Sequence, residues 1–294
     1  MMIQQINRLQ NINTIWAGNA ETMKLTSLFN ETDKAWVDIY DNIKWLDQSR
    51  YFTWTSERDG WRHLYKVSRD GKEFRLITKG PFDVVSIQCI DEKGGFVYYI
   101  ASPESNIDRY LYRSRLDGTG VAERITPAGD PGHHSYNISP NGSWAVHTFN
   151  NAVTPSVIEM VALPQHTSVK IFEENKTARE EFKTLGLQPK EFFRIPLAGV
   201  TLDGWMIRPP HFDPAKKYPV IVYFYEKYSD DLNVHYVPQP SRSTVNFTFY
   251  NSNGYIVFVP DITYRTGEPG RSAYDDIISG TMAFPSVKAA TPPP

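Results

Sequence analysis

The residues best suited to metal or redox chemistry are few and poorly spaced for it. A single cysteine, Cys89, excludes an internal disulfide and a cysteine-based zinc or iron–sulfur site, and we interpret it as a small buried hydrophobic residue. The pair His133-His134 stands in a loop rich in Gly and Pro and lacks a third ligand at metal-binding spacing. His63, beside a tryptophan and an arginine, is expected to be a structural residue rather than a base. The sequence therefore predicts no cofactor and no metal.

Acidic side chains occur in two adjacent pairs, Glu173-Glu174 and Glu180-Glu181. Both pairs fall in a charged stretch with few apolar residues. Such runs usually form a solvated face, and that is the role we expect for them.

Length and composition indicate which class of protein, and which kinds of secondary structure, could position a functional site. The chain has 294 residues, of which 40% are hydrophobic and 22% charged, and its formal net charge is −2. These values are typical of a globular protein with one large or two ordinary domains, and they give no electrostatic reason to expect a nucleic-acid partner. No apolar run approaches the roughly 18 residues of a membrane span, and residues 1–8 do not read as a signal peptide. Aromatic residues make up 14% of the chain, as in β-rich folds.

A repeated hairpin pattern fills the first two-thirds of the chain. Leu-Tyr pairs begin at Leu64 and Leu111, and each is followed six residues later by an Asp-Gly turn and then by a second β-type run. Further aromatic or β-branched runs cover residues 51–54, 96–100, 144–149 and 157–161. Four short strands in each period of roughly 40–50 residues are typical of a β-propeller blade. About three blades fit between Trp36 and Phe172, whereas a closed propeller needs four or more.

The last third of the chain has a different pattern. Paired strands are expected at 192–195 and 204–208, joined near Asp203-Gly204. Two apolar runs, 218–225 and 254–261, predict strands buried on both faces. Residues 270–284 predict a helix, which completes the start of an α/β sheet. Its candidate packing residues are Ile277, Ile278, Met282 and Phe284.

Two stretches carry a family resemblance. Residues 51–80 resemble a propeller blade of the dipeptidyl peptidase IV group of prolyl-oligopeptidase-type serine peptidases, and residues 208–220 resemble the entry into that family's α/β-hydrolase domain. The match runs from about Trp36 to Phe284. The resemblance implies a mixed fold: a partial β-propeller of about three blades followed by the N-terminal part of an α/β-hydrolase domain. The expected divisions are 1–35 (partial blade or irregular segment), 36–172 (propeller), 173–190 (linker with a short helix), 191–284 (start of the peptidase domain) and 285–294 (disordered tail).

The resemblance implies a serine hydrolase that releases dipeptides from peptide N-termini, usually after proline, by a Ser-His-Asp triad. That chemistry needs a nucleophile elbow, Gly-x-Ser-x-Gly, which the sequence lacks. The nearest string, Gly270-Arg-Ser272-Ala-Tyr, lacks the final glycine and precedes the expected helix, so we interpret Ser272 as a helix N-terminal residue. All three triad residues would lie beyond residue 294, and the chain alone is predicted to be inactive.

One catalytic role is carried over by the resemblance. The strand 218–225 aligns with the family strand ending in a tyrosine whose hydroxyl stabilises the oxyanion, which assigns that role to Tyr225. An aromatic packing role is the alternative for Tyr225, with Tyr223 and Tyr228 as rivals. Asp261 and Arg265 occupy a turn expected to shape the loop, which the flanking glycines at 267 and 270 permit.

The expected partners follow from the same resemblance. A peptide is the substrate of the full-length family, relatives can form homodimers, and relatives are periplasmic or secreted. The family's paired glutamates for the substrate amino terminus lie earlier in the chain than the acidic pairs found here. Two other functions remain open from the sequence: a propeller-type protein-interaction module, and a non-functional truncated gene product.

Overall fold

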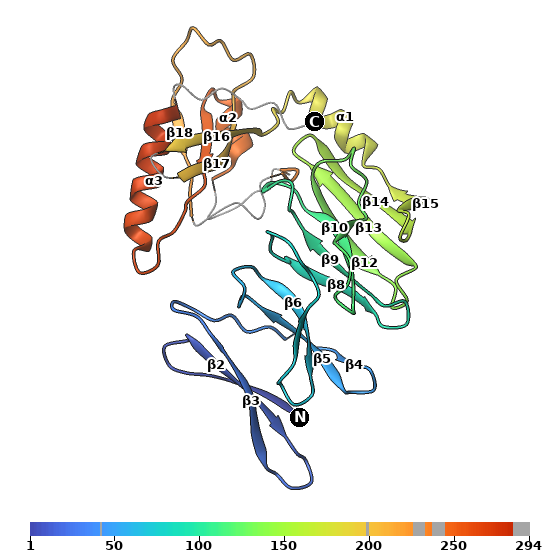
Figure 1. Cartoon of the computed structure of the whole chain (residues 1–294). Helices are drawn as coiled ribbons and strands as arrows, with labels where there is room; N and C mark the ends of the chain where they lie inside the picture. The colour runs from blue at the N-terminus through green and yellow to red at the C-terminus, as the bar shows by residue number, and fades with distance from the viewer. Residues whose placement is uncertain (42, 198–199, 226–232, 237–244, 285–294) are drawn as a thin grey trace.

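The described part of the chain forms five β-sheets and three helices (Figure 1). The structure is a computed structural model that describes residues 1–41, 43–197, 200–225, 233–236 and 245–284. None of the described helices has the length and apolar character that crossing a membrane requires.

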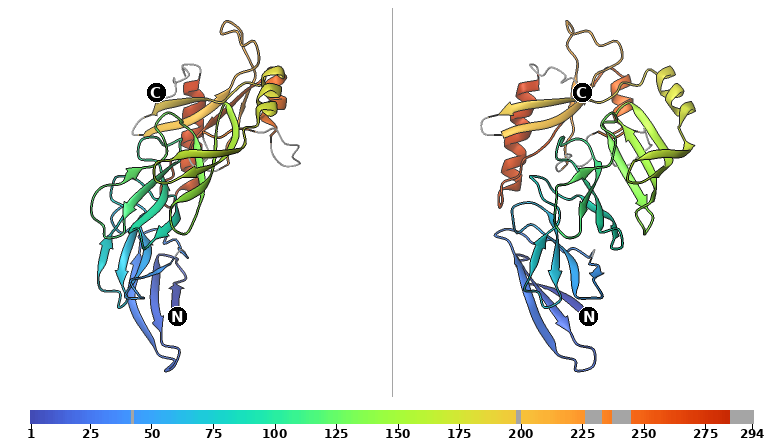
Figure 2. Two further views of the ribbon diagram at one scale, coloured as in Figure 1. Left: turned by 90° about the vertical axis from the view of Figure 1, so that its right-hand side faces the viewer. Right: turned by 45° about the vertical axis from the view of Figure 1, so that its right-hand side comes forward.

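Antiparallel sheets follow one another along residues 2–173 (Figures 1 and 2). The first has three strands and the next three have four strands each, with every strand paired to its neighbour in the chain. The strands are β1 (Met2–Ile6), β2 (Ile12–Gly18) and β3 (Leu25–Thr32); β4 (Trp45–Leu46), β5 (Tyr51–Ser56), β6 (His63–Ser68) and β7 (Phe74–Leu76); β8 (Ser86–Asp91), β9 (Phe96–Ala101), β10 (Tyr110–Arg115) and β11 (Glu123–Arg124); and β12 (His133–Ile138), β13 (Trp144–Asn151), β14 (Thr154–Ala162) and β15 (Thr167–Glu173).

The Asp-Gly turns predicted from the repeat are confirmed. Gly71 and Gly118 follow β6 and β10 with φ values of 73° and 70°, a backbone conformation that favours glycine. A Cβ atom on Gly71 would lie 2.7 Å from the Cβ of Leu28. The first turn therefore packs directly against β3 of the preceding sheet.

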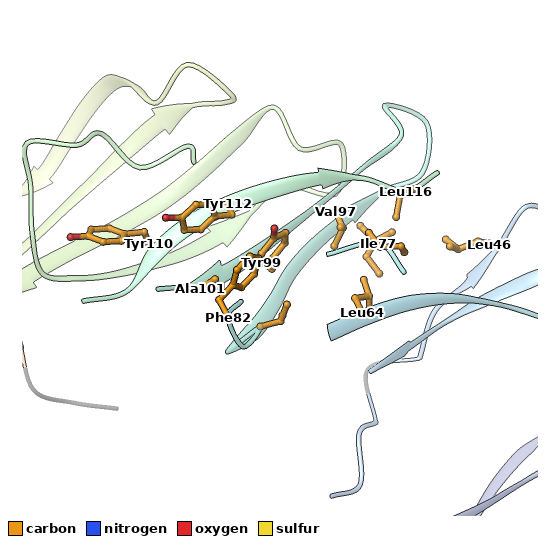
Figure 3. Packing of buried hydrophobic residues seen from close by; sticks show 12 residues of the cluster. Leu46, Leu64, Ile77, Phe82, Val97, Tyr99, Ala101, Tyr110, Tyr112 and Leu116 are labelled. Carbon is orange, nitrogen blue, oxygen red and sulfur yellow. The ribbon is translucent and has the colours of Figure 1, made fainter. Parts of the chain in front are cut away.

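Neighbouring sheets share buried apolar clusters. In the cluster of Figure 3, side chains from the second sheet, such as Leu64, meet an aromatic stack from the third. Phe82 and Tyr99 lie 6.2 Å apart between ring centroids, as do Tyr99 and Tyr112. Complete burial of one large apolar side chain contributes about 1.5–3 kcal/mol, so such clusters hold the successive sheets together.

The fifth sheet is mixed and has the order β16-β17-β19-β18. It follows helix α1, and its strands β18 and β19 are parallel, whereas the other pairs are antiparallel. The elements are α1 (Lys176–Thr184), β16 (Glu191–Leu197), β17 (Val200–Ile207), β18 (Val220–Val222), α2 (Phe247–Ser252), β19 (Ile256–Pro260) and α3 (Pro269–Ala283).

Side-chain alternation gives this sheet two buried faces. Trp205 and Val259 point to the face covered by Phe247 and Tyr250 of α2 and by Ile107 from the β9–β10 loop. The alternate residues of the same strands, such as Met206 and Phe258, point to the opposite face and pack with the end of α3. The sheet therefore separates α3 from the loops of the antiparallel sheets.

Three expectations for this region are wrong in detail. Asp203-Gly204 lies inside β17 rather than at the hairpin turn, because pairing with β16 continues to Leu197 and Val200. Glycine is needed there because a Cβ on Gly204 would lie 2.4 Å from the Phe193 ring. Strand β18 is shorter than the predicted run and is not buried on both faces, since it lies at the sheet edge and Val220 is 39% exposed.

Helix α3 appears where it was predicted, but only part of its apolar pattern packs. Ile277 is buried, and Phe284 contacts the cluster around Phe258. Ile278 and Met282 are exposed at 48% and 77%, so their expected packing is wrong for the described chain. The helix contacts β16 and β19 along one narrow face, which leaves these two positions outside it.

Candidate functional site

Polar contacts join the fifth sheet to the loops of the antiparallel sheets. Asn106, in the β9–β10 loop, donates from Nδ2 to Asp203 Oδ2 at 3.0 Å, and Arg194 Nε donates to the other oxygen of this carboxylate at 2.7 Å. Asp203 therefore links a loop of the third sheet to two strands of the fifth.

Asn233 makes a second link. It is 8% exposed, donates from Nδ2 to Asp108 Oδ1 at 2.5 Å, and accepts from the Ala152 backbone N–H at 3.2 Å. Its own N–H donates to Ile107 O. Asp108 is 2% exposed, so this hydrogen bond satisfies a carboxylate that water does not reach.

A cavity of about 400 Å³ lies at this junction. Loop residues 61–62, 81–85 and 102–109 line one side, and the ends of β17 and β19 line the other. Charges of both signs line it: Arg62, Arg109, Asp83, Asp203 and Asp261.

The two arginines differ in their contacts. Arg109 is 6% exposed and donates to the carbonyls of Asn106 and Asp108, so it holds the shape of its own loop. Arg62 lines the cavity, and its Nε is buried without a hydrogen-bond partner among the described residues.

Tyr225 and Asp261 follow the carboxyl ends of neighbouring parallel strands. Val222 of β18 pairs with Phe258 of β19, and the next residue, Tyr223, donates its N–H to Phe258 O at 3.0 Å. In open α/β sheets this edge is where ligands bind. The Tyr225 side chain is 78% exposed, and its hydroxyl makes no hydrogen bond to a described residue. The rival Tyr223 packs against Phe247 at 5.0 Å, and Tyr228 lies outside the described residues.

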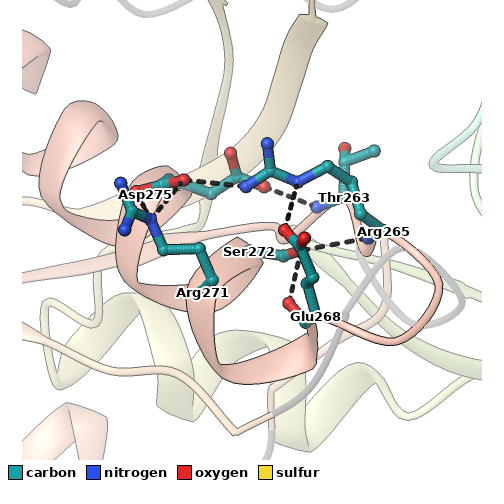
Figure 4. A network of polar contacts seen from close by, with 7 residues as sticks. Thr263, Arg265, Glu268, Arg271, Ser272 and Asp275 are labelled. Carbon is teal, nitrogen blue, oxygen red and sulfur yellow. Dashed lines mark hydrogen bonds and ion pairs between the residues drawn. The ribbon is translucent and has the colours of Figure 1, made fainter.

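Ser272 lies at the N-terminal end of helix α3, as the sequence predicted, and its hydroxyl belongs to a network of polar contacts within the protein (Figure 4). It lies in the first turn of α3, is 2% exposed, and donates from Oγ to Glu268 O at 2.8 Å. The same oxygen accepts the Arg265 backbone N–H at 3.0 Å, while the Arg265 guanidinium pairs with Asp275 at 2.8 Å. Gly267, with a φ of 81°, allows the turn between them. These contacts support the loop-shaping role expected for Arg265.

His134 belongs to a buried cluster that the sequence reasoning did not identify. It lies on β12, 2% exposed, with Nδ1 at 2.9 Å from His147 Nε2, and His147 in turn contacts Glu159 at 3.0 Å. Burial lowers the pKa of His134 to about 3. No group of three His, Cys, Asp or Glu side chains among the described residues is arranged to hold a metal ion. The sequence pattern that could have revealed this cluster is the alternation of His134, Tyr136 and Ile138, which places them on one face of β12. His147 lies opposite Tyr136 on the neighbouring strand β13.

The other candidates have local partners or solvent contact. Cys89 is buried, as expected, and burial raises the pKa of its thiol. His63 is 2% exposed and contacts Asp59 Oδ2 at 2.8 Å through Nδ1. Among the acidic pairs, Glu174 forms an ion pair with Lys176, and the side chains of Glu180 and Glu181 are exposed.

Comparisons with known proteins agree on one family. The family model described as the dipeptidyl peptidase IV (DPP IV) N-terminal region matches residues 1–156. A probable dipeptidyl-aminopeptidase B of Emericella nidulans is 29% identical over 290 residues, which cover 93% of this chain and 31% of that protein. A probable dipeptidyl-aminopeptidase B of Aspergillus clavatus is 30% identical over 233 residues, covering 76% of this chain and 24% of that protein.

Solved structures show the same fold. The crystal structure of Porphyromonas gingivalis dipeptidyl peptidase 4 matches with a TM-score of 0.81 at 24% identity, covering 97% of this chain and 41% of that one. A putative dipeptidyl aminopeptidase IV from Bacteroides ovatus matches with a TM-score of 0.78 at 21% identity, covering 97% and 44%. The chain thus spans about a third or less of the length of the two dipeptidyl-aminopeptidases B described above. Because the family model covers more than half of the sequence, the chain belongs to the dipeptidyl peptidase IV family.

Proposed function

We propose that residues 1–294 are the part of a DPP IV-family serine peptidase in which the propeller meets the hydrolase domain. Residues 36–172 are three propeller blades, each a four-stranded antiparallel sheet, and residues 1–35 contribute part of another. Residues 173–190 link them to 191–284, the first strands and helices of an α/β-hydrolase domain. The tail 285–294 lies outside the described residues.

The observation that carries this proposal is the position of the 400 Å³ cavity. It lies between loops of the blades and the strand-end edge of the fifth sheet, beside Asp261. An active site between the two domains would use this edge. Its lining charges of both signs suit a peptide, which presents a free amino group and backbone carbonyls.

Tyr225 is the oxyanion stabiliser in this proposal. An exposed phenol hydroxyl at the end of β18 is available to donate to a developing negative charge. One such donor is typically worth about 3–4 kcal/mol of transition-state stabilisation. The reaction of the complete site is hydrolysis that releases an N-terminal dipeptide through an acyl-enzyme.

Residues 1–294 by themselves do not catalyse this reaction in our proposal. They contain no Gly-x-Ser-x-Gly string, and the hydroxyl of Ser272 is already committed to Glu268 O and the Arg265 N–H. The 294-residue chain should neither turn over a Gly-Pro chromogenic substrate nor react with a fluorophosphonate serine probe. Labelling that disappears in Ser272→Ala would contradict the proposed inactivity.

Peptide binding tests the cavity separately from catalysis. Calorimetric titration with the tripeptide Gly-Pro-Ala should show weak saturable binding that N-acetylation of the peptide reduces. Asp83→Asn, which changes a cavity carboxylate, should weaken it, whereas Asp41→Asn on the exposed surface should not. Equal binding by both variants, or a broad non-cooperative thermal melt of the chain, would contradict the proposal.

A further inference from the structure

A second cavity, of about 230 Å³, lies at the other end of β17. Ile207 contributes to its wall, whereas the first cavity is lined by Leu202 and Asp203 of the same strand. At about 3.4 Å per residue, these positions are roughly 13–17 Å apart along the strand. The second cavity lies between α1 and α2, at the start of β14, so it is separate from the proposed active site.

The charged residues that line this cavity are all basic. Arg179 and Lys183 come from α1, and Lys190 from the segment before β16; no Asp or Glu occurs among the described lining residues. The guanidinium of Arg179 makes no hydrogen bond or ion pair with a described residue, and its Nε is buried. A buried donor without a partner costs free energy unless a ligand or water satisfies it.

His235 also lines the cavity. Both ring nitrogens are buried, and backbone hydrogen bonding to Ala152 and Asn151 raises the pKa of the ring. Burial has the larger effect and lowers that pKa, so the ring is neutral at pH 7. Its position is fixed by the backbone N–H, which donates to Asn150 Oδ1 at 3.0 Å.

The rest of the wall is apolar. The ring of Phe182 meets His235 edge-on at 4.7 Å between centroids, and Leu187, Pro155 and Ile207 complete the lining. A fully hydrated inorganic ion would leave this surface without contact. The wall therefore favours a ligand with a carboxylate at one end and an apolar body at the other.

We propose that this cavity binds an organic carboxylate with an apolar body, held by the Arg179 guanidinium and packed against Phe182. The ligand adds charge-assisted hydrogen bonds to the guanidinium of Arg179, whose Nε lacks a partner among the described residues. The binding site does not depend on peptidase activity, so it can be tested in the 294-residue chain.

The test uses 4-phenylbutyrate and its neutral amide, 4-phenylbutyramide, in calorimetric titrations at pH 7 and low salt. The carboxylate should bind saturably and the amide at least about tenfold more weakly, since only the anion pairs with Arg179. Arg179→Gln should weaken carboxylate binding by about tenfold, and Lys183→Gln should weaken it less. Lys176→Gln on the same helix, an exposed residue already paired with Glu174, should leave it unchanged.

Circular dichroism and thermal melts establish that each variant is folded before titration. Carboxylate binding that is equal in Arg179→Gln and the parent chain would overturn the proposal, as would equal binding of acid and amide. No saturation by 4-phenylbutyrate at millimolar concentration in the folded parent chain would also overturn it.

Discussion

His134 and His147 stack with their ring centroids 5.1 Å apart and with His134 Nδ1 at 2.9 Å from His147 Nε2. His134 Nε2 faces Asp130 O at 2.8 Å, and a carbonyl oxygen can only accept, so this nitrogen donates. A neutral His134 therefore has its lone pair on Nδ1, which faces His147 Nε2.

This arrangement predicts loss of stability in acid. The pKa of His134 falls from 6.5 to about 3 on folding, because burial disfavours the charged ring. Below pH 6.5 the unfolded chain binds a proton that the folded chain does not, so the free energy of unfolding decreases as the pH falls. His134 contributes a slope of up to about 1.4 kcal/mol per pH unit until its folded pKa is reached. Urea unfolding between pH 7 and pH 4 measures this slope.

Two variants isolate the contribution of His134. His134→Phe, beside the stacked Phe149 at 4.7 Å, should flatten the pH dependence even where it lowers stability at pH 7. His133→Gln, on the opposite face of β12, should keep the parent slope. The same slope in His134→Phe as in the parent chain would assign the acid sensitivity elsewhere.

Glu31 should be a strong determinant of stability at the first sheet. It is 8% exposed, accepts from Trp54 Nε1 at 3.0 Å and Ser56 Oγ at 2.8 Å, and pairs with Arg58. Glu31→Ala leaves these donors without their acceptor and should destabilise the chain by about 3–5 kcal/mol. Glu73→Ala removes an exposed ion pair and should cost less than about 1 kcal/mol. Chemical denaturation compares the two, and similar losses would contradict the importance of the buried carboxylate.

Asn233 should hold the junction between the fifth sheet and the preceding loops. Asn233→Ala removes the donor to buried Asp108 and the acceptor for Ala152 N–H, at an expected cost of about 1–3 kcal/mol. Hydrogen exchange should accelerate around residues 106–109 and 150–153, while β5 and β6 in the second sheet should keep the parent rates. Uniform acceleration throughout the chain would indicate global destabilisation instead.

Local signals were enough to predict most of the strands, but not which residues meet across the fold. The Asp-Gly turns at Gly71 and Gly118 were identifiable because these short turns need a positive φ, which glycine adopts without steric cost. The apolar run before Tyr225 predicted a buried strand, yet β18 lies at an edge, because strand order depends on pairing between distant segments. Tertiary packing brings Asn233 to Asp108 and places Arg179 and His235 at one cavity. These residues are far apart in the sequence, and no local sequence pattern predicts that they meet.

Gly204 provides a direct test of the one turn that was misplaced. As a turn residue it would tolerate alanine at small cost, but inside β17 a Cβ would lie 2.4 Å from Phe193 Cζ and 2.6 Å from Val259 O. Gly204→Ala should therefore destabilise the chain by about 1–3 kcal/mol through overpacking, and the near-UV circular dichroism of the stacked Phe193 and Phe258 should change.

The matched control is Gly270→Ala at the start of α3, where no atom lies within 4 Å of the added Cβ. There alanine should leave stability unchanged or raise it by up to about 1 kcal/mol, because alanine favours helix more than glycine does. Thermal melts of the two variants make the comparison with a single chemical change, the addition of one methyl group. If Gly204→Ala behaved like Gly270→Ala, the close packing of Phe193 on β17 would be wrong.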